Sequence, residues 1–413
     1  MGGMLTKPVM SAVNESYGNP IFRVGSSCVN GYRESMEDAH LVFMKPHWGF
    51  FGVFDGHVNG ECSQYVAEEF EALLQTLTPP VSDERLKEIA LAIDKKFIDA
   101  KRTGGSTGTF FFAEKMNDTI QLTVGNVGDS RVLACKDGVC VSLTTDHKPT
   151  LIRERRRIET CGGYVDNARV NGSLAVSRAF GDIDYKGNAT GDQLNQPVIA
   201  LPDVTHCELA FAGPDFALLA CDGVFEGNFS NEEVIDFVKA KLGTVQDPTT
   251  VAQMVCEEAI TRGSKDNISC VIVMFENRPG FAGEAVPKRY VPGPFSLPHN
   301  QDFQKAYFAM AKVTGLSPDQ ALEMRYDHVQ ASGEAFAENE ATFFKDGPPK
   351  ELSGIERTRW FGAQLRAPEG NRRDSMEAMA RFQHLQGMGI PFHIIQELLA
   401  DAGRGPQGGA KRL

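Results

Sequence analysis

Four short acidic clusters, each beside an apolar run, constrain the fold of this chain more than any other feature. They are Glu37-Asp38, Asp55-Gly56-His57, Asp222-Gly223 and Asp266-Asn267. The runs beside them (LVF, FFGVF, FALLAC and ISCVIV) are rich in β-branched and aromatic residues, which favour strands. Because a strand holds its terminal side chains at a fixed edge of a sheet, clusters that lie far apart in the sequence can meet there.

Carboxylates that converge in this way indicate a bound cation. Unpaired carboxylates repel one another and raise each other's pKa unless a positive ion neutralises them. Oxygen ligands without nearby pairs of Cys or His suit Mg²⁺ or Mn²⁺ rather than Zn²⁺. The clusters therefore predict a metal-dependent enzyme.

Each cluster taken alone also has a simpler interpretation as a turn. Asp followed by Gly or Asn is common in turns, and Asp137-Gly138 in ACKDGVCV is expected to be an ordinary hairpin turn. The other clusters differ from this turn in the residues that accompany them in the sequence. The first of these is Arg33, four residues before Glu37.

Composition narrows the class of protein. The chain has 413 residues, a hydrophobic content of 42% and a net charge of −12, which together predict a soluble protein that does not bind nucleic acid. Residues 278–413 hold 17 Lys/Arg and 16 Asp/Glu, so the acidity lies in residues 1–277. The nine cysteines include no CxxC pair, which favours free thiols in the reducing cytoplasm.

The pattern of apolar residues predicts four segments. Residues 1–20 are expected to form an irregular N-terminal arm, and residues 21–277 a domain of strands and helices. Residues 278–300 are rich in Pro and Gly and are expected to be a linker, followed by a helical C-terminal extension at 301–413. Helix-like runs in that extension lie near 301–314, 318–343, 373–387 and 391–401.

Within residues 21–277, strands joined by short turns alternate with helices that come in pairs. This order predicts an α+β fold with antiparallel sheets covered by helices, not a doubly wound parallel sheet. The expected strands lie at 51–57, 119–135, 138–143, 216–225 and 267–275, and the expected helices at 62–77, 82–100, 150–162, 230–242 and 248–263.

The N-terminus matches the pattern for N-myristoylation. In MGGMLT, Gly2 would carry the acyl group after removal of Met1. A single acyl chain gives only weak and reversible membrane attachment. The expected location is therefore cytoplasmic, with weak membrane association through Gly2.

A longer set of motifs resembles the PPM-type Ser/Thr protein phosphatases, also called the protein phosphatase 2C family. The resemblance covers about residues 20–277, and its motifs occur in the order and at the spacing of the family. They are RESMEDAH (33–40), VFDGH (53–57), STG (106–108), GDSR (128–131), DHKP (146–149), GG (162–163), RVNGSLAVSRAFGD (169–182), YK (185–186), CDGV (221–224) and KDN (265–267).

The resemblance implies a four-layer α-β-β-α sandwich of two antiparallel sheets flanked by helix pairs, with residues 21–277 as the catalytic domain. It also implies an Mn²⁺- or Mg²⁺-dependent phosphatase that hydrolyses phosphoserine and phosphothreonine in proteins. Water activated by two metal ions would attack phosphorus, with no covalent intermediate. The expected partners are phosphoprotein substrates, and the expected oligomeric state is a monomer.

The same resemblance assigns roles to individual residues. Asp55 would bridge the two ions, with the Gly56 carbonyl as a further ligand. The remaining ligands would be Asp222 and Asp266 directly and Glu37 and Asp38 through water, and Asp129 with Glu226 and Asp222 would hold a third, weaker ion.

Arg33 would bind the phosphate, because a guanidinium fork matches phosphate oxygens two at a time. His57 is expected to be the general acid that protonates the leaving alkoxide. The alternative, an imidazole that orients a metal-bound water, stays open at this point.

Three positions depart from the family pattern. Val58-Asn59-Gly60 stands where Gly usually follows the His, Phe225-Glu226 replaces Trp-Asp, and Gly108 replaces a common Ala. None of these changes removes a core ligand, although the longer Glu226 weakens the case for a third metal.

Two other functions compete with this interpretation. Cys256 and Arg262 have the Cys-x5-Arg spacing of cysteine phosphatases, but the intervening helix-like EEAIT carries two carboxylates that would repel phosphate. The second rival is a regulatory binding module that uses a phosphatase fold, with partner recruitment by the C-terminal extension. Intact ligands at Asp55, Asp222 and Asp266 favour the enzyme.

Overall fold

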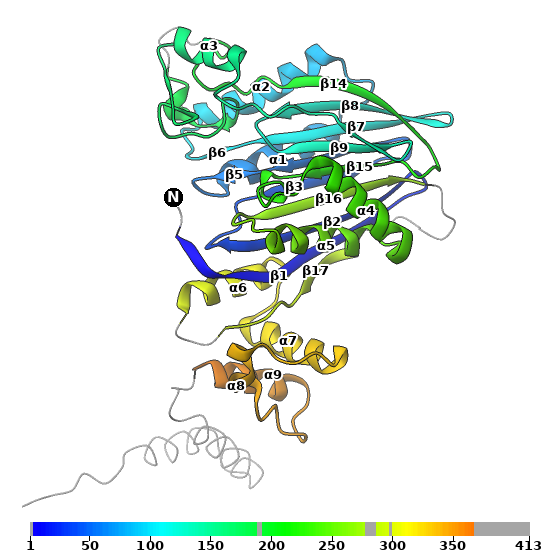
Figure 1. Ribbon diagram of the computed structural model, residues 1–413, viewed down its shortest axis with the longest axis vertical. Coiled ribbons are helices and arrows are strands. Elements are labelled where there is room, and N and C mark those ends of the chain that lie inside the picture. The colour runs from blue at the N-terminus through cyan, green and yellow to red at the C-terminus, as the bar shows by residue number, and fades with distance from the viewer. Residues whose placement is uncertain (1–2, 188–191, 277–285, 297–299, 367–413) are drawn as a thin grey trace, which may run out of the picture. The chain divides into compact units, whose positions relative to one another are not determined.

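The computed structural model describes residues 3–187, 192–276, 286–296 and 300–366. The chain divides into two compact units, Met1–Leu316 and Ser317–Leu413. The first unit contains two large sheets, drawn with their helices in Figure 1. All pairings between the named strands are antiparallel, and the expected α+β class with two antiparallel sheets is confirmed.

The larger sheet has seven strands in the order β10-β9-β15-β16-β2-β1-β17. Their bounds are β10 Val139–Ser142, β9 Arg131–Lys136, β15 Phe216–Ala220, β16 Ile268–Phe275, β2 Phe22–Arg33, β1 Met4–Gly18 and β17 Val286–Val291. Its central strands are apolar on both faces because both faces are covered.

The second sheet has five strands in the order β14-β8-β7-β4-β3. Their bounds are β14 Asp203–Ala210, β8 Thr119–Val127, β7 Gly108–Met116, β4 Trp48–Phe54 and β3 Ala39–Met44. The short strands β5 Gly56–His57, β6 Gly105–Ser106 and β13 Phe180–Gly181 pair in the order β13-β6-β5, and β11 Val165–Asp166 pairs with β12 Arg169–Val170.

Successive side chains along a strand point to opposite faces of its sheet, so each large sheet contributes to a core on both of its faces. In β15, Phe216, Leu218 and Ala220 join the core shared with α4 (Asn231–Val245) and α5 (Pro248–Thr261). The intervening Ala217 and Leu219 face the core between the two sheets. On the other side, α1 (Glu61–Leu74) and α2 (Asp83–Asp99) cover the five-stranded sheet, so the layers run α-β-β-α.

The remaining short elements of this unit are α3 Ile152–Thr160 and the 3₁₀ turns η1 Ile183–Tyr185 and η2 Asp222–Val224. The expected helices at 62–77, 82–100, 150–162, 230–242 and 248–263 match α1 to α5 within a few residues. Ser230 and Glu233 form the expected capping box at the start of α4.

The N-terminal arm was predicted wrongly, because Met4–Gly18 is a strand. β1 pairs with β2 on one side, as Asn14 does with Ser27, and with β17 on the other. The register of β1 shifts between Met4 and Val9, and Pro8, which cannot donate a ladder hydrogen bond, lies in that irregular stretch. The alternation of apolar and polar residues is interrupted here, so the sequence did not indicate a strand. β1 is held in place by its pairing with β2 and β17.

The linker prediction for residues 278–300 was also wrong in part. Val286–Val291 forms β17 at the edge of the seven-stranded sheet, where the Tyr290 hydroxyl bonds with Ser11 Oγ at 2.9 Å. Helix α6 (Gln301–Val313) packs on β1 through buried residues that include Phe303 and Met310, within the first compact unit. The helical extension expected from residue 301 therefore starts, as a separate compact unit, at Ser317.

The second unit contains α7 (Pro318–Ser332), α8 (Glu338–Phe344) and α9 (Gly354–Arg366). In the interior of this unit the Arg325 guanidinium donates a hydrogen bond to Glu340 at 2.8 Å. The rings of Tyr326, Phe344 and Phe361 form an aromatic cluster. The expected helices at 373–387 and 391–401, like the acylation site Gly2, lie outside the described residues. Among the helices that the structure describes, none is long and apolar enough to cross a bilayer.

Candidate active site

Strand ends from both sheets deliver the acidic clusters to one place. Asp55 follows β4 and Asp38 precedes β3, both in the five-stranded sheet. Asp222 closely follows β15 and Asp266 precedes β16, both in the seven-stranded sheet. The carboxylate of Asp55 is close enough to those of the other three to be affected by their charges.

Two groups of potential ligand atoms lie within this region, each with its atoms within 4.8 Å of one another. The first contains Asp38, Asp55 and Cys221, and the second contains Asp222, Glu226 and Asp266. Burial raises the pKa of the Cys221 thiol, and its sulfur is occupied with the backbone at Ser269 and Asn267. Cys221 is therefore a packing residue, and the ligands of the first group are the two carboxylates.

The electrostatics of the site fit a hard cation. Burial and neighbouring carboxylates raise the pKa values of Asp55 and Asp222 well above the ordinary value. Burial also raises the pKa of Asp38 to about 6, although the Ser269 hydroxyl donates to its Oδ2 at 2.7 Å. Asp222 Oδ1 is buried and has no hydrogen-bond partner among the described residues, which leaves an oxygen for an ion.

Backbone contacts hold the Arg33–Asp38 segment against this group. The side-chain amide of Asn267 donates to the carbonyls of Asn30 and Ser35 at 2.9 and 3.0 Å, and its carbonyl accepts from the Glu37 amide at 2.9 Å. A Cβ at Gly56 would lie 2.3 Å from the Glu37 carbonyl oxygen, so this position accepts only glycine. The Glu37 carboxylate belongs to neither ligand group and accepts a hydrogen bond from Ser35.

Arg33 lies beside the second group. Its Nη2 donates to Asp266 Oδ2 at 2.6 Å, and its side chain is 39% exposed. Nε has no hydrogen-bond partner within the described residues. The guanidinium is thus held at one end and has donors left for an anion.

His57 is held by a residue to which the sequence assigned no role. Its Nε2 lies 2.9 and 2.8 Å from the two carboxylate oxygens of Asp182. Burial alone would lower the pKa of His57, but the hydrogen bond and charge of Asp182 outweigh burial and raise it. A Cβ at Gly105 would lie 2.3 Å from both Asp182 Oδ2 and His57 Nε2, so Gly105 makes the pairing possible. The signal for Asp182 was present in the RVNGSLAVSRAFGD motif.

The structure does not bring together all the residues expected to bind a third metal ion. Glu226 lies with Asp222 and Asp266, whereas Asp129 belongs to neither ligand group. Asp129 is instead paired with the ammonium of Lys148, from the DHKP motif. The third-metal assignment stays a prediction, and Lys148 is a functional candidate that the sequence analysis missed.

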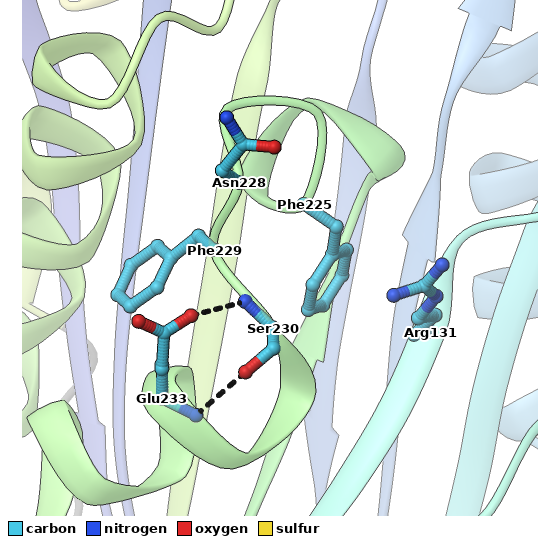
Figure 2. Close-up of a pocket in the computed structure, with 6 residues that line it drawn as sticks. All are labelled: Arg131, Phe225, Asn228, Phe229, Ser230 and Glu233. Atoms are coloured by element: carbon cyan, nitrogen blue, oxygen red, sulfur yellow. Dashed lines mark hydrogen bonds between the residues drawn. The ribbon is translucent and has the colours of Figure 1, made fainter.

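Phe225, which stands where the family usually has Trp, borders a pocket of about 350 Å³ (Figure 2). In Figure 2 the Phe225 ring faces Arg131, whose guanidinium carbon lies 4.4 Å from the ring centroid. Arg131 also donates from Nε and Nη2 to Asp146 and from Nη1 to Asn231. The Arg131 guanidinium is thus already engaged by Asp146, Asn231 and the Phe225 ring. These contacts explain its place beside the pocket as structural.

Comparison with known proteins agrees with this geometry. Residues 22–268 match the family model "Protein phosphatase 2C". The chain is 35% identical over 318 residues to protein phosphatase 1B of Mus musculus, covering 70% of this chain and 79% of that protein. It is 34% identical over 317 residues to protein phosphatase 1A of Homo sapiens, covering 70% and 80%.

Among solved structures, a phosphatase from Toxoplasma gondii matches with a TM-score of 0.63 and 29% identity, covering 68% of this chain and all of that one. The family model spans well over half of the chain, and its range contains Arg33, His57 and the four converging aspartates. The chain therefore belongs to the protein phosphatase 2C family, which is Mn²⁺- and Mg²⁺-dependent.

Proposed function

We propose that this chain is a metal-dependent protein phosphatase that hydrolyses phosphoserine and phosphothreonine. The observation that carries the proposal is the convergence of Asp38, Asp55, Asp222 and Asp266 from four strand ends of two sheets. Arg33 and His57, the two residues suited to phosphate binding and proton transfer, flank the same group.

Two cations are the occupants that best fit this site. Asp38, Asp55 and the Gly56 backbone would hold one, and Asp55, Asp222 and Asp266 the other, with Glu37 near the first. When bound, the ions would supply an activated water and screen the negative charge of the phosphate. Two observations support this assignment: the raised pKa values of Asp38, Asp55 and Asp222, and the Asp222 Oδ1 atom, which has no hydrogen-bond partner in the described part of the chain.

Arg33 binds the phosphate of the substrate in this proposal. Its anchor on Asp266 fixes the guanidinium plane, so less side-chain entropy is lost when its remaining donors meet phosphate oxygens. A planar fork with charge-assisted hydrogen bonds orients the phosphate as well as holding it.

His57 donates a proton to the leaving seryl or threonyl oxygen. Asp182 keeps the imidazole protonated and fixes its orientation through Nε2. Because Nε2 is engaged by Asp182, the proton for the leaving oxygen comes from Nδ1. The alternative, that His57 orients a water molecule, predicts a different dependence on the leaving group.

We also propose a monomeric cytoplasmic enzyme with weak membrane attachment through an acyl group on Gly2. Met4, two residues after Gly2, pairs with Arg33 at the start of β1. Incorporation of alkyne-tagged myristate into the chain, and its loss in Gly2→Ala, would test the attachment. Absence of label from the wild type would refute it.

The function is tested by phosphate release from a phosphothreonine peptide after treatment with EDTA and readdition of Mn²⁺ or Mg²⁺. We expect activity that returns only with metal and is abolished by Asp222→Asn. Asp137→Asn is the matched control, because Asp137 is also followed by glycine but lies in the turn between β9 and β10. Full activity in Asp222→Asn would contradict the proposal.

The same assay distinguishes the phosphatase from the alternative, a regulatory binding module. If the full chain is inactive with metal, a chain ending at residue 316 should be tested. A cut at residue 277 would remove β17 and α6, which pack on β1. Activity regained at 316 would assign an inhibitory role to the C-terminal unit, and continued inactivity would favour the binding module.

A further inference from the structure

Val58, which directly follows His57, has a backbone conformation that valine rarely adopts. Its φ is +74°, in the left-handed region, where a β-branched side chain is strained. Among the non-glycine residues with positive φ in the described ranges, Val58 is the only β-branched one. The others are Lys101, Asn117, Asp137, Asn167, Ala168, Asn171, Asp182, Ala212, Asn228 and Gln246.

The fold gains little from this valine. Its side chain is 77% exposed, so the isopropyl group contributes little to any core. The turn that leads into α1 is organised by the next residue, Asn59, whose Oδ1 accepts a hydrogen bond from the Glu61 amide at 2.9 Å. Glycine would suit position 58 better, both sterically and by backbone conformation.

The inner side of the turn is closed. A Cβ at Gly104 would lie 3.0 Å from Asn59 Oδ1 and 3.1 Å from the His57 carbonyl oxygen. The His57 carbonyl and the Asn59 side chain, on either side of Val58, are therefore packed against Gly104, while the Val58 side chain is exposed to solvent. An exposed apolar group thus stands one residue from the imidazole that faces the substrate in the proposed mechanism.

Backbone strain of this kind clusters at active sites and ligand-binding sites, and the strained Val58 directly follows His57. We infer that Val58 determines specificity by contacting an apolar side chain next to the phosphorylated residue of the substrate. This inference rests on the proposed phosphatase function. It names the substrate class as phosphoproteins with an apolar neighbour beside the phosphoserine or phosphothreonine.

Chain geometry allows the contact. The Cα of Val58 is one peptide unit, about 3.8 Å, from that of His57. In an extended substrate the residue next to the phosphoresidue is displaced by about the same distance, within reach of an isopropyl group. Partial burial of valine against such a side chain is expected to change kcat/KM by about three- to tenfold.

The test uses two phosphothreonine peptides that differ only in having Leu or Asn on both sides of the phosphothreonine. Each is assayed with Mn²⁺, and the rates of each protein are normalised to its own hydrolysis of p-nitrophenyl phosphate. We expect the wild type to prefer the Leu peptide about fivefold. Val58→Gly and Val58→Asn, both compatible with positive φ, should reduce that preference to near one.

A thermal melt accompanies the assay, and Val58→Gly is expected to melt no lower than the wild type, because glycine relieves the strain. Val139→Asn is the matched control, since Val139 is 64% exposed on β10 and should leave the peptide preference unchanged. A preference that survives both Val58 substitutions would overturn the inference and leave the phosphatase proposal standing. Failure of both the full chain and the chain ending at residue 316 to hydrolyse the two peptides would overturn both proposals.

Discussion

His57 Nε2 and the carboxylate of Asp182, 125 residues later in the chain, lie 2.8 Å apart. His57 comes from β5 and Asp182 follows β13, the two outer strands of the three-stranded β13-β6-β5 sheet. The central strand, β6, contributes Gly105, whose missing side chain leaves room for the pair. This arrangement makes Asp182 the residue that positions His57.

Asp182→Asn should slow hydrolysis of the phosphothreonine peptide by about ten- to a hundredfold, because the amide preserves the shape but removes the charge that holds the imidazolium. His57→Ala should have a similar effect, and the double variant should lose little more, since both changes remove one function. Hydrolysis of p-nitrophenyl phosphate should fall far less, because its leaving group needs little protonation. Equal losses on both substrates would refute the general-acid role and favour an imidazole that orients water.

Arg33→Ala should mainly raise KM. A charge-assisted hydrogen bond contributes about 1.5–3 kcal/mol, so KM is expected to increase by about ten- to a hundredfold. Steady-state kinetics and product inhibition by inorganic phosphate would measure the effect, and both constants should weaken together. A loss confined to kcat would show that Arg33 acts on chemistry and not on binding.

Metal binding should stabilise the fold by relieving repulsion among the aspartates. With Mn²⁺ at about a hundred times its Kd, mass action gives about 2.7 kcal/mol, visible as a rise of several degrees in Tm. In EDTA, Asp55→Asn should melt above the wild type, because burial and the charges of Asp38 and Asp222 raise the pKa of Asp55 and make its ionised form costly. A lower Tm for this variant in EDTA would contradict that reading.

Acid should destabilise the fold through Glu154. Burial alone would raise its pKa, but hydrogen bonds and charges from Arg178 and Arg157 outweigh burial and lower it from 4.5 to about 2. A carboxyl whose pKa is lowered by folding stabilises the protein above its unfolded pKa and loses that contribution as pH falls through the folded pKa. The contribution of Glu154 should therefore decline from about pH 4.5 towards pH 2.

Glu154→Gln isolates this effect. We expect a loss of about 3 kcal/mol at neutral pH, because Arg178 and Arg157 lose a buried partner, and a shallower decline of the free energy of unfolding in acid. Glu159→Gln on the same helix is the control, since Glu159 is exposed and its contact with Arg155 is long, at 4.0 Å. Chemical denaturation from pH 7 to pH 2 would measure both, and parallel curves for Glu154→Gln and the wild type would contradict the assignment.

Local pattern predicted much of this fold. Helices α1, α2, α4 and α5 have apolar faces that read clearly in the sequence, and the acidic clusters mark the strand ends of the site. The run at 119–135 was predicted as one strand-like segment. It forms β8 and β9, which belong to different sheets, because the chain turns at Gly128, whose φ is +107°. Local periodicity cannot show such a change of sheet.

Residues that act through partners were harder to predict. Strand β1 depends on pairing with β2 and β17, and Asp182 depends on a contact across β6. Lys148 follows the same logic, since only the folded chain brings it to Asp129. Long-range pairing of this kind has no local signature, whereas ligands at the ends of apolar runs do.

The central claim is that the converging aspartates hold the ions that make this chain a phosphatase. It is tested most directly by titrating the metal-stripped full chain with Mn²⁺ while following phosphate release from a phosphothreonine peptide. The account predicts no release before Mn²⁺, a saturable rise with Mn²⁺, and no rise in Asp222→Asn. Release without metal, or the same titration curve in Asp222→Asn, would contradict it.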